Sequence, residues 1–139
     1  GLYALNDKYS PQEFANKYRT PSYVSLYTVL SESGVVFQPY SSLFLISQRS
    51  EHKSLNRVDI IYKNIKNSVL LNNLGITSNN HISKASPERA LCDTVYLMGS
   101  QYFDNLRNVN WDLVKEINLD VYTNNATIGR WIHENTKQI

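Results

Sequence analysis

The spacing of apolar residues changes twice along the chain, and this change constrains the fold more than any other feature. At 10–34 and again from 86 onward, apolar residues recur every three or four positions, as in amphipathic helices. At 35–85, short apolar runs alternate with turn residues, which is typical of strands. The connections there are too short for the crossovers that parallel strands need. The sequence therefore predicts an α+β fold, with short helices packed on a small, mainly antiparallel sheet and a C-terminal helical segment.

Three of the expected helices begin alike, with a hydroxyl residue followed by proline. Such a residue caps the free amides of the first turn, and proline fits the first helical position. These starts are Ser10-Pro11, Thr20-Pro21 and Ser86-Pro87, and they predict helices over 11–18, 21–33 and 87–98. Asn110 and Asn125 are the expected caps of two further helices.

Between the helical segments, strands are expected wherever an apolar run is bounded by turn residues. The expected strands are 35–37, 43–46, 58–63, 69–71 and 81–85, with a hairpin loop over 47–56 and an Asn-rich turn over 75–80. Residues 1–9 are expected to form a short strand or extended segment.

Length and composition favour one globular domain over 1–139. The chain has 139 residues, 42% of them apolar, and a net charge of +2, which excludes a disordered chain. A lone Cys92 excludes a disulfide scaffold and predicts a reducing compartment, hence a cytoplasmic protein. No apolar run has the length of a membrane span. Because the chain begins with Gly1 rather than Met, it is expected to be processed or part of a longer protein.

The sequence contains little that points to catalysis. The three histidines and the cysteine lack the spacing of metal ligands, and there is no Gly-rich phosphate loop or nucleophile elbow. We therefore expect no enzymatic activity, metal, cofactor or small-molecule substrate. Asp93 lies inside an expected helix, with Arg89 one turn before it. Their spacing predicts an ion pair that fixes the helix; acid–base catalysis by Asp93 is the alternative.

The positive charge is uneven along the chain. Five cations against two carboxylates lie between residues 49 and 66, in the expected hairpin. A solvated surface explains such a stretch, and a contact patch for an acidic or phosphate-bearing partner is the functional interpretation. With two cations at the end of the first helix, the candidate contact residues are Lys17, Arg19, Arg49, Lys53, Arg57, Lys63 and Lys66.

Ten tyrosines offer a second kind of surface. Tyr23 and Tyr27 follow the helical apolar stripe and are expected in the core. Tyr40, Tyr62 and Tyr102 are candidates for an exposed surface, and tyrosine is favoured at protein interfaces.

Two segments together resemble a known family. The first combines Gly1-Leu2-Tyr3 with Pro21-Ser22-Tyr23-Val24-Ser25-Leu26 and a later Gly34, and the second runs from Ala85 to Leu97 as ASPERALCDTVYL. In this order and spacing they resemble the abortive-infection AbiEi antitoxin family over about residues 1–100. The motif residues that carry the resemblance are Pro21, Ser22, Tyr23, Pro87, Glu88, Arg89 and Asp93. Arg89 stands where the family more often has Lys.

The resemblance implies a bacterial transcriptional regulator. Members of the family join an N-terminal winged helix-turn-helix to a C-terminal domain of helices around a small sheet. They repress their own operon and counteract a nucleotidyltransferase-like toxin in a type IV toxin–antitoxin pair. This chain is then expected to be the C-terminal domain, with the winged helix-turn-helix absent from it. The implied partners are operator DNA, bound mainly through the N-terminal domain, and the toxin system. A basic surface on the C-terminal domain assists DNA binding in this family.

A protein from another functional class remains the alternative. An adaptor domain of unrelated function would use exposed tyrosines to bind a protein partner, without basic contacts to nucleic acid.

Overall fold

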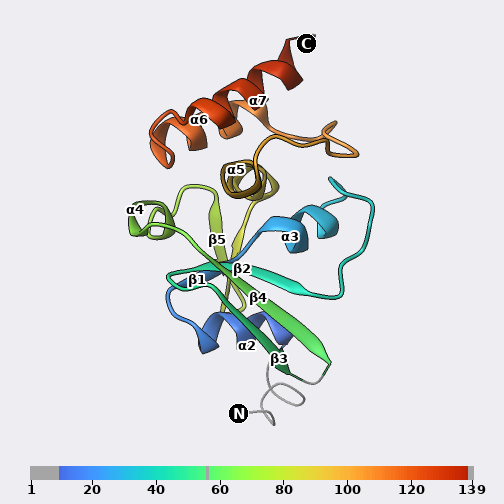
Figure 1. The fold of residues 1–139 in the computed structure, drawn as a ribbon, viewed down its shortest axis with the longest axis vertical. Helices are drawn as coiled ribbons and strands as arrows, with labels where there is room; N and C mark the ends of the chain where they lie inside the picture. Colours follow the sequence, from blue (N-terminus) through green and yellow to red (C-terminus); the bar gives the residue numbers. More distant parts are fainter. Residues whose placement is uncertain (1–9, 56, 138–139) are drawn as a thin grey trace.

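The computed structural model describes residues 10–55 and 57–137, and these form an α+β fold (Figure 1). The predicted fold class is confirmed. The strand expected within 1–9 lies outside the described residues. In chain order the elements are α2 (Pro11–Tyr18), β1 (Ser22–Val24), α3 (Leu26–Glu32), β2 (Leu43–Ser47), β3 (Glu51–Leu55), β4 (Val58–Asn64), α4 (Asn67–Leu70), β5 (Ile76–Asn79), β6 (Ile82–Ala85), α5 (Pro87–Met98), α6 (Trp111–Asp120) and α7 (Ala126–Thr136).

The elements stack in layers around one sheet (Figure 1). Helix α2 packs against one face, on β1, β2 and β6. Helix α3 covers β2 on the other face and contacts α5. Helices α6 and α7 pack on α5 and on each other, so they form an outer layer that is remote from the sheet. Helix α5 is thus buried between the sheet layer and the C-terminal helices.

The sheet is mixed, with the strand order β3-β4-β2-β1-β6-β5. Among the described strands, β1/β2, β3/β4 and β5/β6 are antiparallel, while β1/β6 and β2/β4 are parallel. The expectation of a mainly antiparallel sheet missed the two parallel pairs. The β2–β4 connection is short, but β3 runs back within it as a strand, so β2 and β4 point the same way without a helical crossover.

The helix starts that the sequence marks by capping residues are confirmed. The side chains of Ser10, Ser86, Asn110 and Asn125 each accept a hydrogen bond from a backbone amide in the first turn of α2, α5, α6 and α7. Helices α2 and α5 also end at the predicted positions, Tyr18 and Met98, and Gly99 follows α5 with a positive φ.

The helix predicted over 21–33 is wrong in its first part. Residues 22–24 form β1, and the helix begins only at Leu26. Strand β1 lies in the middle of the sheet between β2 and β6, where Tyr23 and Val24 are buried. A buried strand followed directly by a helix produced the apolar spacing of one longer helix.

Four other expectations in the middle third are also corrected. Residues 35–37 form no strand, and 69–71 fall on α4 and its end rather than on a strand. The expected loop at 47–56 contains β3, and the expected turn at 75–80 contains β5. Both are edge strands, and their exposed polar residues carry no apolar alternation.

Gly75 lies where the α4–β5 connection meets α5 and α6. Its φ is +79°, and a Cβ there would lie 3.0 Å from Arg89 Cβ and 3.0 Å from Ile117 Cδ1. Gly34 has the same φ, but a Cβ there would meet no atom within 4 Å. A substitution at Gly34 therefore adds backbone strain alone, whereas one at Gly75 adds backbone strain and a steric clash.

We predict that Gly75→Ala destabilises the protein more than Gly34→Ala. Both variants carry the left-handed backbone cost of about 1–2 kcal/mol. Gly75→Ala also overpacks the core, which costs about 1–3 kcal/mol more. Urea unfolding of both variants measures the difference, and equal losses would show that the α4–β5 connection does not pack as described.

Candidate functional site

The two charged residues that the sequence singles out on α5 form a buried pair. Arg89 and Asp93 are both 0% exposed, and Arg89 Nε lies 3.5 Å from Asp93 Oδ1. This is an ion-pair contact that is longer than a normal hydrogen bond. The predicted i, i+4 pairing is therefore present, and the remaining polar atoms of both side chains find other partners.

Asp93 accepts hydrogen bonds from three hydroxyl groups. Ser25 Oγ donates to Oδ2 at 2.8 Å, and the hydroxyl of Tyr23 donates to the same oxygen at 3.0 Å. The hydroxyl of Tyr122 donates to Oδ1. Because these donors come from β1, the start of α3 and the turn after α6, the carboxylate ties α5 to elements on both sides of it.

Arg89 fixes the segment between α4 and β5. Its Nη1 donates to the carbonyls of Asn72 at 2.9 Å and Leu74 at 2.6 Å, and its Nη2 donates to the carbonyl of Val69 at 2.8 Å. Nη2 also lies 3.2 Å from the hydroxyl of Tyr23, whose ring is under the guanidinium. We call Arg89, Asp93, Tyr23, Ser25 and Tyr122 the buried network.

The burial of this network decides its chemical role. Burial raises the pKa of the Asp93 carboxyl, while Arg89 and the three hydroxyl donors oppose that rise. Since neither Arg89 nor Asp93 has any exposed surface, no substrate reaches them in this conformation. The network acts as a structural centre, and the sequence-based alternative of acid–base catalysis at Asp93 has no open site.

Only part of the network is evident from the sequence. Arg89, Asp93 and Tyr23 stand out there, but Ser25 and Tyr122 do not. Tyr122 lies 29 positions after Asp93, so no local spacing signals their contact. Ser25 stands within the first motif of the resemblance, which was the available signal.

Other residues that could bind a metal or take part in catalysis do not cluster in the described part of the chain. Within the described residues, no group of three His, Cys, Asp or Glu side chains is arranged to hold a metal. Cys92 is fully buried, and burial raises the pKa of its thiol. Glu88 is also buried, and its carboxylate accepts a hydrogen bond from the Asn110 amide at 3.0 Å, which joins α5 to the start of α6.

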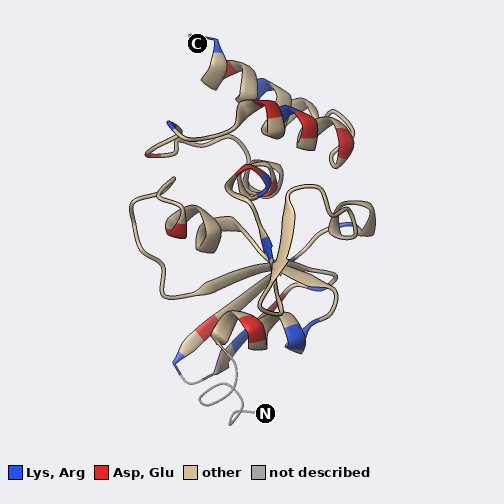
Figure 2. Cartoon of the chain, turned by 180° about the vertical axis from the view of Figure 1, so that it is seen from behind, with Lys and Arg blue, Asp and Glu red and all other residues tan. Residues whose placement is uncertain are grey.

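The seven candidate contact cations come from several elements, and Lys and Arg residues are spread over the chain in Figure 2. Arg19 and Lys53 both lie over the ring of Tyr18, at 5.1 and 4.8 Å from its centroid. Arg49 follows β2, and Lys66 follows β4, which runs parallel to β2. Arg19, Arg49 and Lys66 thus lie near the carboxyl ends of β2 and β4, whereas Lys53 pairs with Ile60, which lies opposite the first residue of β2.

The other three candidates lie elsewhere. Lys17 pairs with Glu13 on α2 at 3.3 Å. Arg57 is exposed in the turn between β3 and β4, at the opposite end of the hairpin from Arg49. Lys63 follows Tyr62 on β4 and therefore projects from the sheet face opposite to α2.

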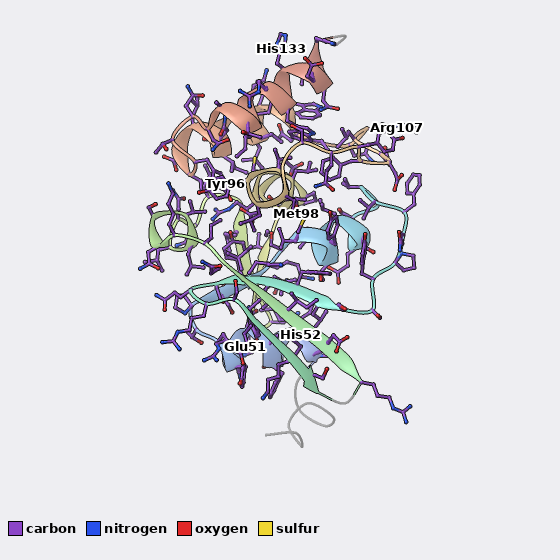
Figure 3. All side chains as sticks on the ribbon, in the orientation of Figure 1. Glu51, His52, Tyr96, Met98, Arg107 and His133 are labelled. Atoms are coloured by element: carbon purple, nitrogen blue, oxygen red, sulfur yellow. The ribbon has the colours of Figure 1, made fainter. Side chains whose placement is uncertain are left out.

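A small pocket lies beside two of these cations, Arg19 and Arg49. Its volume is about 190 Å³, and its lining residues are Tyr18, Arg19, Thr20, Pro21, Ser47, Gln48 and Arg49. Glu51, labelled in Figure 3, holds Arg19 from β3 by an ion pair and a hydrogen bond of 2.6 Å from Arg19 Nε. The hydrogen bond from Arg19 lowers the pKa of Glu51, so both charges persist at neutral pH.

The tyrosines divide differently from expectation. Tyr62 is 1% exposed, and its hydroxyl donates to the Ala15 carbonyl at 2.6 Å, so its expected exposure is wrong. Tyr23 is buried as expected, although on a strand, and Tyr27 is half-buried. Tyr40 and Tyr102 are exposed, as are Phe37 and Met98, which is labelled in Figure 3.

Comparison with known proteins gives no relatives: no protein-family model, curated protein or solved structure matches this chain. None of the helices in the described part of the chain combines the length and apolar character of a membrane span.

We predict that Arg89→Met lowers the free energy of unfolding by about 3–5 kcal/mol, because it leaves the Asp93 charge and three carbonyls buried without their partner. Arg89→Lys keeps the charge but not the guanidinium fork, so its loss is smaller. Denaturant unfolding at neutral pH measures both. Arg107→Met, at an exposed position in the α5–α6 loop, is the matched control; a loss for Arg89→Met no greater than for this control would contradict a structural role.

Proposed function

We propose that this chain is the regulatory domain of an AbiEi-like antitoxin and transcriptional repressor, which acts in the cytoplasm. It would counteract a nucleotidyltransferase-like toxin and assist operator binding by a winged helix-turn-helix that precedes it. The observation that carries the proposal is where the two motifs meet. Tyr23 and Ser25 of the first motif bind Asp93 of the second, and Arg89 of the second contacts Tyr23.

These contacts make the two motifs depend on each other. The residues lie about 70 positions apart in the sequence, but they satisfy one another's buried polar groups. A change in one motif therefore leaves an unpartnered group in the other. A core shared with the AbiEi family would require both motifs together. Their contact therefore favours the resemblance over a chance similarity of two short segments.

The surface supports a contact function rather than catalysis. Arg49 and Lys66 are exposed and form no ion pair with any described residue, so both charges are free to meet an acidic or phosphate-bearing partner. They lie at the same end of two parallel strands, so one partner surface reaches both.

The adaptor alternative also has a specific observation behind it. Phe37 is 69% exposed and Tyr102 is 83% exposed, on the loops that follow α3 and α5. These loops touch, because the Asn105 amide donates to the Val35 carbonyl at 3.0 Å and the Phe37 amide to Asp104 at 2.7 Å. Exposed aromatic side chains on adjoining loops are typical of a protein-binding surface.

We predict that Arg49→Glu/Lys66→Glu in the full-length gene product impairs toxin neutralisation, operator binding, or both. The test is growth of cells that co-express the neighbouring nucleotidyltransferase-like gene, together with an operator gel shift. The melting temperature is expected to stay within a few degrees, because neither cation has a buried partner.

Two comparisons make this test decisive. Arg107→Glu/Arg130→Glu reverses two exposed charges away from this surface and is expected to keep both activities. Phe37→Ser/Tyr102→Ser tests the adaptor surface. If Arg49→Glu/Lys66→Glu has no effect while Phe37→Ser/Tyr102→Ser abolishes partner binding, the adaptor function replaces the proposal.

A further inference from the structure

We propose that the pocket between α2 and the β2–β3 turn binds a phosphomonoester group, with Arg19 and Arg49 as its paired cations. This inference uses the pocket alone and does not depend on the proposed antitoxin function. The two arginines come from separate elements, one from the end of α2 and one from the turn after β2, and both line the same pocket. A site built from two elements presents its donors to one ligand from two directions.

Other contacts hold the Arg19 guanidinium and the Arg49 backbone in place. Glu51 binds the Nε side of Arg19, and the ring of Tyr18 lies under its guanidinium. The backbone of Arg49 is fixed by buried Ser47, whose Oγ donates to the Arg49 carbonyl at 2.6 Å and accepts from its amide at 3.3 Å. Less conformational freedom therefore has to be lost when an anion binds.

The charge balance suits a dianion. Arg19 and Arg49 line the pocket, Lys53 lies over the ring of Tyr18 at its edge, and Glu51 pairs with Arg19, so these four groups carry a net charge of +2. A phosphomonoester carries about −1.5 to −2 charges at neutral pH. It also offers three oxygens to the two guanidinium forks, whereas a carboxylate offers two oxygens and a single charge.

Helix C-termini carry partial negative charge, which disfavours an anion. At the end of α2 this effect is reduced, because two of the last four carbonyls already accept hydrogen bonds. The Ala15 carbonyl accepts from Arg19 N and from the Tyr62 hydroxyl, and the Asn16 carbonyl accepts from the hydroxyls of Thr20 and Ser22 at 3.3 Å each.

The volume limits what the pocket encloses. At about 190 Å³ it is smaller than the roughly 300–1,000 Å³ of sites for drug-sized ligands. It therefore has room for a phosphoryl group, while the rest of a nucleotide or a phosphorylated side chain would remain outside. The pocket is open, so the phosphoryl group is expected at the end of a larger molecule.

The test is a residue-resolved NMR titration of the whole chain at constant ionic strength. The probes are inorganic phosphate, adenosine monophosphate, O-phosphoserine and a DNA duplex without terminal phosphates, with adenosine and serine as uncharged counterparts. We expect saturable shifts at the amides of Gln48 and Arg49 with the three monoester or phosphate probes. Whichever of adenosine monophosphate and phosphoserine binds at lower concentration identifies the source of the group.

The matched variants are Arg49→Gln and Arg57→Gln, which remove one exposed cation at either end of the same hairpin. We expect Arg49→Gln to weaken the affinity for phosphate at least tenfold, while Arg57→Gln changes that affinity less than twofold. No saturable shifts, equal weakening by both variants, or binding of the duplex alone would each overturn the proposal. Because the readout is phosphate binding in vitro, its result is separate from that of toxin neutralisation.

Discussion

A single buried ion pair on α5 connects parts of this structure that lie far apart in sequence. Arg89 and Asp93 have no solvent-exposed surface. Through them α5 is joined to β1, to the segment after α4 and to the turn between α6 and α7. Such a pair adds little net stability over an apolar replacement, but removing either partner leaves a buried charge unpaired. Its value is therefore specificity: other packings of α5 leave carbonyls and hydroxyls without partners.

The same network places the surface features that we connect with function. Asp93 holds Tyr23 on β1, and β1 pairs with β2 so that Ser22 lies opposite Ser47. Ser47 in turn fixes the backbone of Arg49, at the edge of the pocket. A chain of hydrogen bonds thus runs from the core to the basic surface. The proposed function and the proposed phosphate site are separate claims, but both use a surface whose geometry depends on this core.

Helix caps and apolar spacing predicted much of the fold. Features that depend on residues distant in the sequence were not predicted. Ser86 and Asn110 marked their helices because capping involves only neighbouring residues. Strand β1 escaped because its three residues are extended only through pairing with β2 and β6, and β3 and β5 escaped because edge strands carry polar residues. At the candidate site, the pairing of Arg89 and Asp93 followed from helical spacing, whereas the contact with Tyr122 did not. Five of the seven cations, from Arg49 to Lys66, were close in sequence, yet strand direction and alternation divided them between surfaces.

Native-state hydrogen exchange of Asp93→Asn reports whether Asp93 couples three parts of the chain. This nearly isosteric change removes the charge and turns one carboxylate oxygen into a donor. We expect amide protection to fall together in β1, in α5 and around Tyr122, by similar factors, while the β3–β4 hairpin keeps its relative protection. A loss of protection confined to α5 would rule out this coupling, because it would mean that the three parts hold their places without the buried network.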